Sequence, residues 1–117
     1  MTVRFREELL ELCEVRFEGD TSIEKSRMMG HPGFKLAHNK KFFLFLNETG
    51  LILKLPPDRY EAALQREDMT PFNPTGGPNP MGSWMVWSRD EPNEYESEWE
   101  WVEDAQRFTA FQPSKQA

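Results

Sequence analysis

The sequence predicts an α+β fold, in which an antiparallel β-sheet is packed by N-terminal, middle and C-terminal helices. Three observations predict it: an apolar stripe of helical spacing at residues 4–17, short alternating apolar runs between residues 34 and 55, and a second helical pattern at residues 93–111. A chain of 117 residues, of which 38% are hydrophobic, suffices for one packed core. We therefore expect one domain over residues 1–112 and a frayed tail at residues 113–117.

The N-terminal third is predicted as a helix, a strand and a loop. Within residues 4–17, four apolar side chains recur at helical spacing: Phe5, Leu9, Leu12 and Cys13. A weak strand is predicted at residues 22–29. Residues 30–33, Gly-His-Pro-Gly, predict a loop because proline and glycine resist both regular structures.

The clearest β signal lies in the middle of the chain. Residues 34–37, 41–46 and 51–55 predict three strands of an antiparallel meander, joined by short turns. The strand at residues 41–46 is apolar on both faces, since Phe42, Leu44 and Leu46 alternate with Phe43 and Phe45. Such a strand is usually covered on both sides. We expect the cover to be a helix on each face or a second protomer.

The rest of the chain predicts one or two further strands and two helices. A short helix begins at Pro57, a residue suited to a first helical turn. Residues 70–83 are rich in proline and glycine and predict an irregular loop, and residues 83–87 predict a strand. On a continuous helix over residues 93–111, Trp101 falls on the apolar face and Trp99 lies well off it.

Charge is unevenly distributed. Residues 1–66 hold 11 basic and 10 acidic residues, whereas residues 67–117 hold 3 and 10, and the whole chain carries −6. A local excess of positive charge lies at residues 22–41 and comprises Lys25, Arg27, Lys35, Lys40 and Lys41. The overall charge disfavours nucleic acid, whereas this patch favours it. Lysines that protect a sheet edge from aggregation are the alternative interpretation.

Candidate catalytic chemistry is sparse. His31 and His38 are the two histidines and Cys13 is the lone thiol, without the spacing of a zinc site. Cys13 lies on an apolar helix stripe, which predicts a buried, inert thiol. The many carboxylates of residues 94–104 are expected to be solvated on a helix face. We expect no metal, no cofactor and no enzymatic activity.

Two tryptophans are candidates for a partner surface. Trp87 and Trp99 are candidates because tryptophan is enriched in interface hot spots, and the alternative is that both cover the sheet edge. The two-faced strand adds Phe43 and Phe45 as candidates. We therefore expect a protein partner or self-association. The longest apolar run is far shorter than a membrane helix and the N-terminus is charged, so we expect a cytoplasmic protein with no membrane contact.

The order of several motifs resembles the TfoX/Sxy N-terminal domain family. The similar segments are Arg27-Met28-Met29-Gly30-His31-Pro32-Gly33, Asn39-Lys40-Lys41-Phe42-Phe43-Leu44, Leu51-Ile52-Leu53-Lys54-Leu55-Pro56, Pro71-Phe72-Asn73-Pro74, Trp84-Met85-Val86 and Trp101-Val102 with Ala105. The resemblance spans about residues 4–110. The chain departs from the family at Lys40, where glycine is usual, and at Met29, where phenylalanine is usual.

The resemblance implies a TfoX N-terminal-like α+β domain with no catalytic residues. It also implies a bacterial regulatory role in competence, exerted together with a transcription activator. The leading hypothesis is thus a non-catalytic regulatory or interaction module, such as a transcription co-regulator. The first alternative is direct DNA binding through the five-residue basic patch. The second is a small-ligand binder or enzyme with a pocket near His31.

Overall fold

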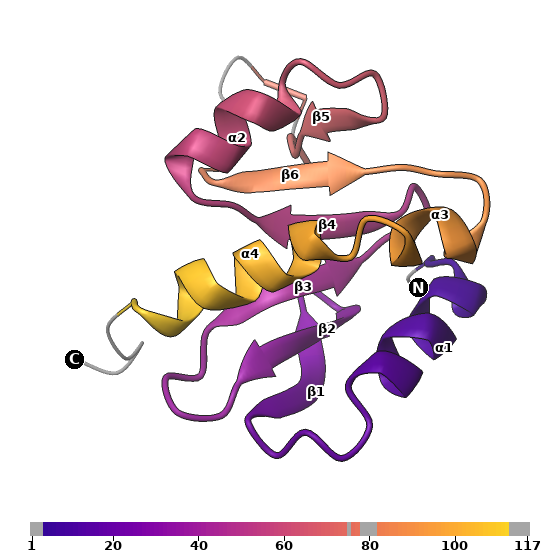
Figure 1. The fold of residues 1–117 in the computed structure, drawn as a ribbon. Coiled ribbons are helices and arrows are strands. Elements are labelled where there is room, and N and C mark those ends of the chain that lie inside the picture. Colours follow the sequence, from indigo (N-terminus) through magenta and orange to yellow (C-terminus); the bar gives the residue numbers. More distant parts are fainter. Residues whose placement is uncertain (1–3, 75, 78–81, 113–117) are drawn as a thin grey trace.

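The computed structural model describes residues 4–74, 76–77 and 82–112. Its elements are α1 (Glu7–Arg16), β1 (Ile23–Met28), β2 (His31–Leu36), β3 (Phe42–Leu46), β4 (Leu51–Lys54), α2 (Pro57–Ala63), β5 (Met69–Pro71), β6 (Trp84–Trp87), α3 (Pro92–Glu96) and α4 (Glu100–Ala110). The strands form one antiparallel sheet in the order β1-β2-β3-β4-β6-β5 (Figure 1). The predicted α+β fold is confirmed. The predicted tail at residues 113–117 lies outside the described residues, as do Pro78 and Pro80 of the predicted loop.

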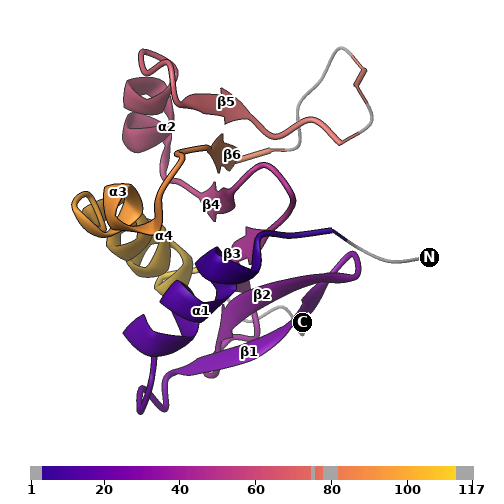
Figure 2. The ribbon, with the colours of Figure 1, turned by 90° about the vertical axis from the view of Figure 1, so that its right-hand side faces the viewer.

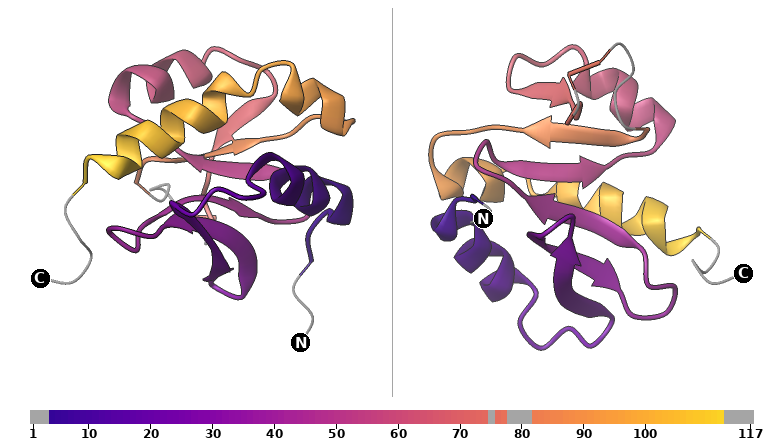
Figure 3. Two further views of the ribbon diagram at one scale, coloured as in Figure 1. Left: turned by 60° about the horizontal axis from the view of Figure 1, so that its bottom comes forward. Right: turned by 180° about the vertical axis from the view of Figure 1, so that it is seen from behind.

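The helices gather on one face of the sheet. Figure 2 shows all four on the same side, and α4 runs across β3 and β4, against which it packs. Seen from behind, the strands lie in front of α4, and no helix among the described residues covers them on that side (Figure 3, right). The molecule therefore has a helix-covered face and an open face.

Strand alternation divides the apolar side chains between the two faces. Leu51 and Leu53 of β4 point into the core beneath the helices, which also contains Leu9 and Cys13 of α1. Ile52 points the other way, opposite Phe45 in the register of β3 and β4. β4 thus shows the period-2 pattern expected of a strand that is buried on both sides. In β3 the predicted alternation is wrong at its start: Phe43 joins the core beneath the helices and Phe42 packs on the open face with Phe45, next to an irregularity in the register with β2.

The open face has a small core of its own. It consists of Phe45, Ile52, Phe72, Trp84 and Val86, against which Met28 and Phe42 pack. The Phe45 ring meets the rings of Phe72 and Trp84 edge-on, at centroid distances of 5.3 and 5.0 Å. The expectation of a second covering helix is wrong for this chain, because side chains of the β1–β2 hairpin and of the segment after β5 cover Phe45 instead.

Residues 30–33 are not a loop. Met29 and Gly30 form the turn, with φ of 52° and 82°, and β2 already begins at His31. Pro32 pairs with Arg27 of β1, and the pairing of β2 with β3 begins only at Gly33. No hydrogen bond to β3 is therefore lost because Pro32 lacks a backbone N–H. A Cβ at Gly33 would lie 2.9 Å from the carbonyl oxygen of Leu44, which explains the glycine.

The C-terminal helical pattern is interrupted. Instead of one helix over residues 93–111, α3 and α4 are joined by a turn in which the N–H groups of Trp99 and Trp101 donate to carbonyls three residues earlier. On a continuous helix Trp99 and Trp101 would lie about 200° apart. The turn lets both be buried, at 6% and 4% exposure. A second missed element is β5, which lies partly within the predicted loop at residues 70–83.

Candidate binding groove on the open face

The four side chains predicted as a partner surface are buried. Phe43, Phe45 and Trp87 are 0% exposed and Trp99 is 6% exposed. Phe43 and Trp99 both pack on the ring of Phe17, with centroids 5.7 and 6.0 Å away. These residues therefore stabilise the fold, and the prediction that they form a surface is wrong. It failed because the sequence showed an apolar strand, and Trp99 off the apolar face of a predicted helix, but not which side chains cover them.

The predicted basic patch does not stay together. The Lys25 ammonium donates to the Glu14 carboxylate of α1, on the helix-covered side. The Lys40 ammonium donates to both oxygens of Glu24, at 3.0 and 2.9 Å, and this bond holds the pKa of Glu24 below its usual value. Two of the five cations are thus engaged in ion pairs, and one of those pairs lies on the opposite face.

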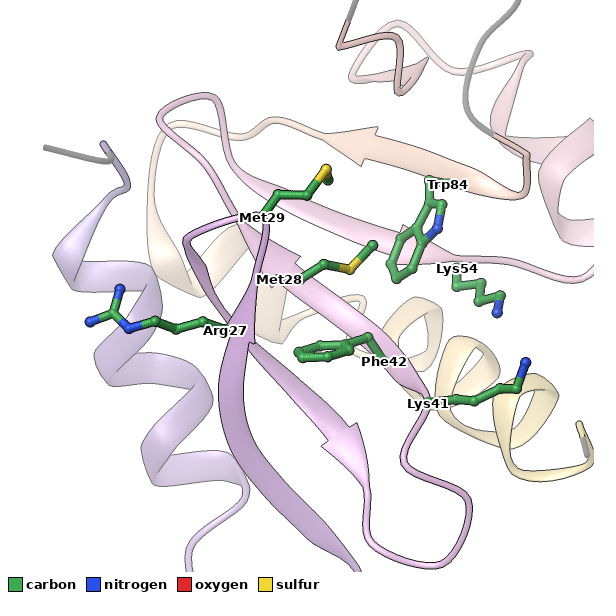
Figure 4. A pocket seen from close by; sticks show the side chains of 7 residues that line it. All are labelled: Arg27, Met28, Met29, Lys41, Phe42, Lys54 and Trp84. Carbon is green, nitrogen blue, oxygen red and sulfur yellow. The ribbon is translucent and has the colours of Figure 1, made fainter. Parts of the chain in front are cut away.

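Of the remaining three cations, Lys35 and Lys41 are near the open face. Lys41 lines a groove there, and the Lys35 ammonium lies 5.9 Å from the centroid of the Phe42 ring. Arg27 also borders the groove, but its side chain extends away from Phe42 and its guanidinium donates to the carbonyl oxygen of Gly30 (Figure 4). The patch predicted from the sequence is therefore reduced to Lys35 and Lys41, with Arg27 at its border.

The groove itself has a volume of about 420 Å³. Its walls come from the β1–β2 turn and from β3, β4 and β6, and comprise Arg27, Met28, Met29, Lys41, Phe42, Lys54 and Trp84. Figure 4 shows the two methionines and the two aromatic rings on one side, and Lys41 and Lys54 together at the other end. The arrangement joins an apolar wall to a cationic end, which suits a ligand that is both flat and anionic.

The apolar wall is fixed by the open-face core. Trp84 is 7% exposed and its ring packs edge-on against Phe45. Lys54 pairs with Trp84 across β4 and β6, and its ammonium lies 6.0 Å from the centroid of the indole ring. Lys54 stands two residues after Ile52 in a predicted strand, and alternation places both on one face, so the sequence held a signal for this residue. Its proximity to Trp84 depends on the register of β4 and β6.

The cationic end is fastened to the end of α4. Asn39 is 2% exposed, and its side-chain amide donates to the carbonyl oxygens of Thr109 and Gln112 at 2.8 and 3.2 Å. Its amide oxygen accepts from the backbone N–H of Lys41. The ammonium of Lys54 donates to the side chain of Gln112 at 2.8 Å. The backbone that bears Lys41 is therefore held by a buried hydrogen-bond network.

Charge is segregated between the two faces. The helices α1, α3 and α4 carry nine acidic and two basic residues. The open face presents Lys35, Lys41 and Lys54, and the carboxylate of Glu24 is paired with Lys40. The prediction that the carboxylates of residues 94–104 are solvated is wrong for Glu94, Glu98 and Asp104, which accept from arginines and are partly buried. A net charge of −6 hides a cationic groove.

A second charged cluster lies beside the start of β5, an edge strand of the sheet. Asp68 accepts from the guanidinium groups of Arg66 and Arg89 and from the indole N–H of Trp87, at 2.9 to 3.1 Å. Hydrogen bonds from Arg66, above all, hold the pKa of Asp68 well below its usual value. Glu98 and Glu94 complete the cluster by accepting from Arg66 and Arg89, respectively. Each of these charged groups contacts at least one group of opposite charge, which indicates a structural role.

The cysteine and the two histidines lie apart from the groove. Cys13 is fully buried and its pKa is raised far above the usual range by desolvation. His31 lies on the open face, 6.1 Å from the Phe45 ring, but does not line the groove, and His38 contacts the carbonyl oxygen of Ala110. Within residues 4–74, 76–77 and 82–112, no three His, Cys, Asp or Glu side chains are grouped to hold a metal ion.

Two further findings bear on identity. The described part of the chain holds no helix long and apolar enough to cross a bilayer. Comparison with family models, with curated proteins and with solved structures found no match. The resemblance to the TfoX/Sxy N-terminal family therefore stays a prediction from the motifs quoted above.

Proposed function

We propose that this protein is a non-catalytic binding module that takes a nucleic-acid strand in the groove of its open sheet face. The observation that carries the proposal is the meeting of Lys41 and Lys54 with the rings of Phe42 and Trp84 along one groove. Phosphates are neutralised by lysines, and bases pack on flat apolar surfaces. A regulatory role, as the TfoX/Sxy resemblance implies, would follow from such binding.

The groove favours the hypothesis of nucleic-acid binding over the hypothesis of a protein partner. The hypothesis of a protein partner rested on the missing catalytic constellation, the acidic charge and a two-faced strand, and the fold buries the four side chains named as its surface. The hypothesis of nucleic-acid binding loses Lys25 and Lys40 to ion pairs, but gains Lys54 and an aromatic wall. Charge segregation removes the objection from the net charge, because the acidic helices lie on the far side of the sheet.

A small anionic ligand with a flat ring is the second candidate. The size of the groove favours it, because about 420 Å³ lies within the range of small-molecule sites. Such a ligand would use the same lysines and the same rings. The two candidates differ in how affinity depends on length: a strand gains phosphate contacts as it lengthens, whereas a small ligand does not.

The test is a titration of fluorescein-labelled DNA by anisotropy at 20 and 150 mM salt. We expect a single-stranded 12-mer to bind at low salt and to weaken steeply as salt is added. Lys41→Gln should weaken binding several-fold and lower the salt slope by roughly 0.7. Lys25→Gln is the matched control: it removes the same charge from the helix side and should leave affinity unchanged.

Three outcomes are informative. Equal losses in the two variants would show that the net charge, and not the groove, controls binding. Binding of a mononucleotide as tight as that of the 12-mer would favour the small-ligand candidate. Absence of binding at 20 mM salt, for oligonucleotide and mononucleotide alike, would overturn both candidates.

A further inference from the structure

We infer that Met29 is a recognition residue that contacts an unpaired base, so that the groove selects single-stranded over double-stranded nucleic acid. This inference rests on the proposed function and deepens it. Two independent observations at Met29, its backbone conformation and its exposure at the groove, carry the argument.

The backbone of Met29 is in the left-handed region. Its φ of 52° is followed by a φ of 82° at Gly30, and the two residues form the turn between β1 and β2. Two-residue turns with positive φ at both positions favour Asn, Asp or Gly at the first position, because a Cβ is strained there. Methionine is therefore a locally unfavourable choice, and strain of this kind clusters at binding sites.

Packing does not explain the choice. Met29 is 54% exposed, whereas its neighbour Met28 packs against the open-face core. The side chain of Met29 instead borders the groove, on the side of Met28 and Trp84 (Figure 4). An exposed, flexible thioether at the rim of an aromatic groove can close over a flat ring, since sulfur contacts aromatic rings favourably.

The geometry favours an unpaired base. The apolar wall of Met28, Phe42 and Trp84 faces a groove with two lysine ammonium groups at one end, so that a base and its phosphate would be held together. In a duplex the flat faces of the bases are covered by their stacked neighbours. A base of a single strand can leave the stack and enter a groove at little cost.

The decisive variant is Met29→Asn, because its two effects have opposite signs. Asparagine suits the turn, so the thermal midpoint should stay equal or rise. Affinity for the single-stranded 12-mer should fall about fivefold or more, the loss expected when one base contact is removed. The salt slope should not change, because no charge is altered. Met29→Leu, which keeps an apolar side chain in the same strained backbone, should retain most of the affinity.

An abasic 12-mer separates base contact from phosphate contact. Wild-type protein should bind it more weakly than the normal strand, and Met29→Asn should bind the two strands nearly alike. If the wild type binds with steep salt dependence but Met29→Asn binds equally well, the role of Met29 is wrong while the proposed function stands. Duplex binding as tight as single-strand binding would also overturn the inference. If no nucleic acid binds, the inference falls together with the proposed function.

Discussion

The groove and the Asp68 cluster are both charged, yet they are built differently. In the cluster, Arg66 and Arg89 each contact two carboxylates, one of which, that of Asp68, they share. In the groove, Lys41 has no ion pair with any residue that the structure describes. The comparison teaches that the arginines of the cluster join carboxylates, whereas Lys41 lies in the groove without an ion pair among the described residues. The positive charge of Lys41 is therefore available to a phosphate group.

The largest expected effect concerns the wall beneath the groove. Phe45→Ala should lower the free energy of unfolding by about 3–5 kcal/mol, because the ring is fully buried and packs on two aromatic neighbours. Urea denaturation measures it, with Phe43→Ala beneath the helices as the control of similar size. A loss below about 1 kcal/mol at Phe45 would mean that the open face is surface and not core.

Asp68→Asn should have the next largest effect. The carboxylate accepts from two guanidinium groups and an indole N–H, so its loss should cost about 2 kcal/mol of stability. The variant should keep the affinity of the groove, because the cluster lies apart from it. A variant as stable as wild type would show that the cluster is a solvent-screened set of ion pairs.

The same carboxylate predicts a pH dependence. The pKa of Asp68 is lowered in the folded protein, mainly by the hydrogen bonds from Arg66. A lowered pKa contributes stability that is complete above the unfolded value, ~3.9, and is lost as the pH falls below it. Wild type and Asp68→Asn should therefore differ most near pH 7 and converge toward pH 2, as thermal melts at several pH values would reveal. A constant difference would contradict the assignment.

Lys41→Gln should have the smallest effect on stability. No ion pair is lost, so the free energy of unfolding should change by less than about 0.5 kcal/mol. Arg66→Gln removes the same charge from the cluster and should cost about 1–2 kcal/mol. Equal effects of the two substitutions in urea denaturation would remove the distinction between structural and groove charges.

Local pattern was sufficient for much of the fold. The meander, the short helix at Pro57 and the strand ending at Trp87 follow from alternation and turn residues, and they are present. The interruption between α3 and α4 was missed, because local propensity favours one helix and tertiary burial of Trp99 and Trp101 overrides it. The start of β2 at His31 was missed because proline usually excludes a strand. Pro32 fits here because no strand needs its N–H in the observed register, and local sequence does not reveal that register.

The groove was only partly predictable. Lys41 was named from charge alone, and strand alternation had already set Lys54 on the same face as Ile52. Met29, Lys54 and Trp84 come together through the pairing of β4 with β6 and the path of the β1–β2 turn. These contacts join residues far apart in the sequence, so no local sequence pattern predicts them. Trp87 and Trp99 were predicted on a surface and are buried, because the long-range contacts that cover them leave no local signal either.

The separation of acidic helices from a lysine-lined sheet face gives the molecule an electric dipole moment. Its sequence pI of about 5.0 reflects only the net charge, which a distant ion experiences. Within a Debye length, about 8 Å at physiological ionic strength, a polyanion meets the local potential of whichever face it approaches. An encounter therefore depends on orientation: approach to the helices is repelled, and approach to the open face is attracted. On a cation-exchange surface at low salt, this acidic protein should be held with one face down.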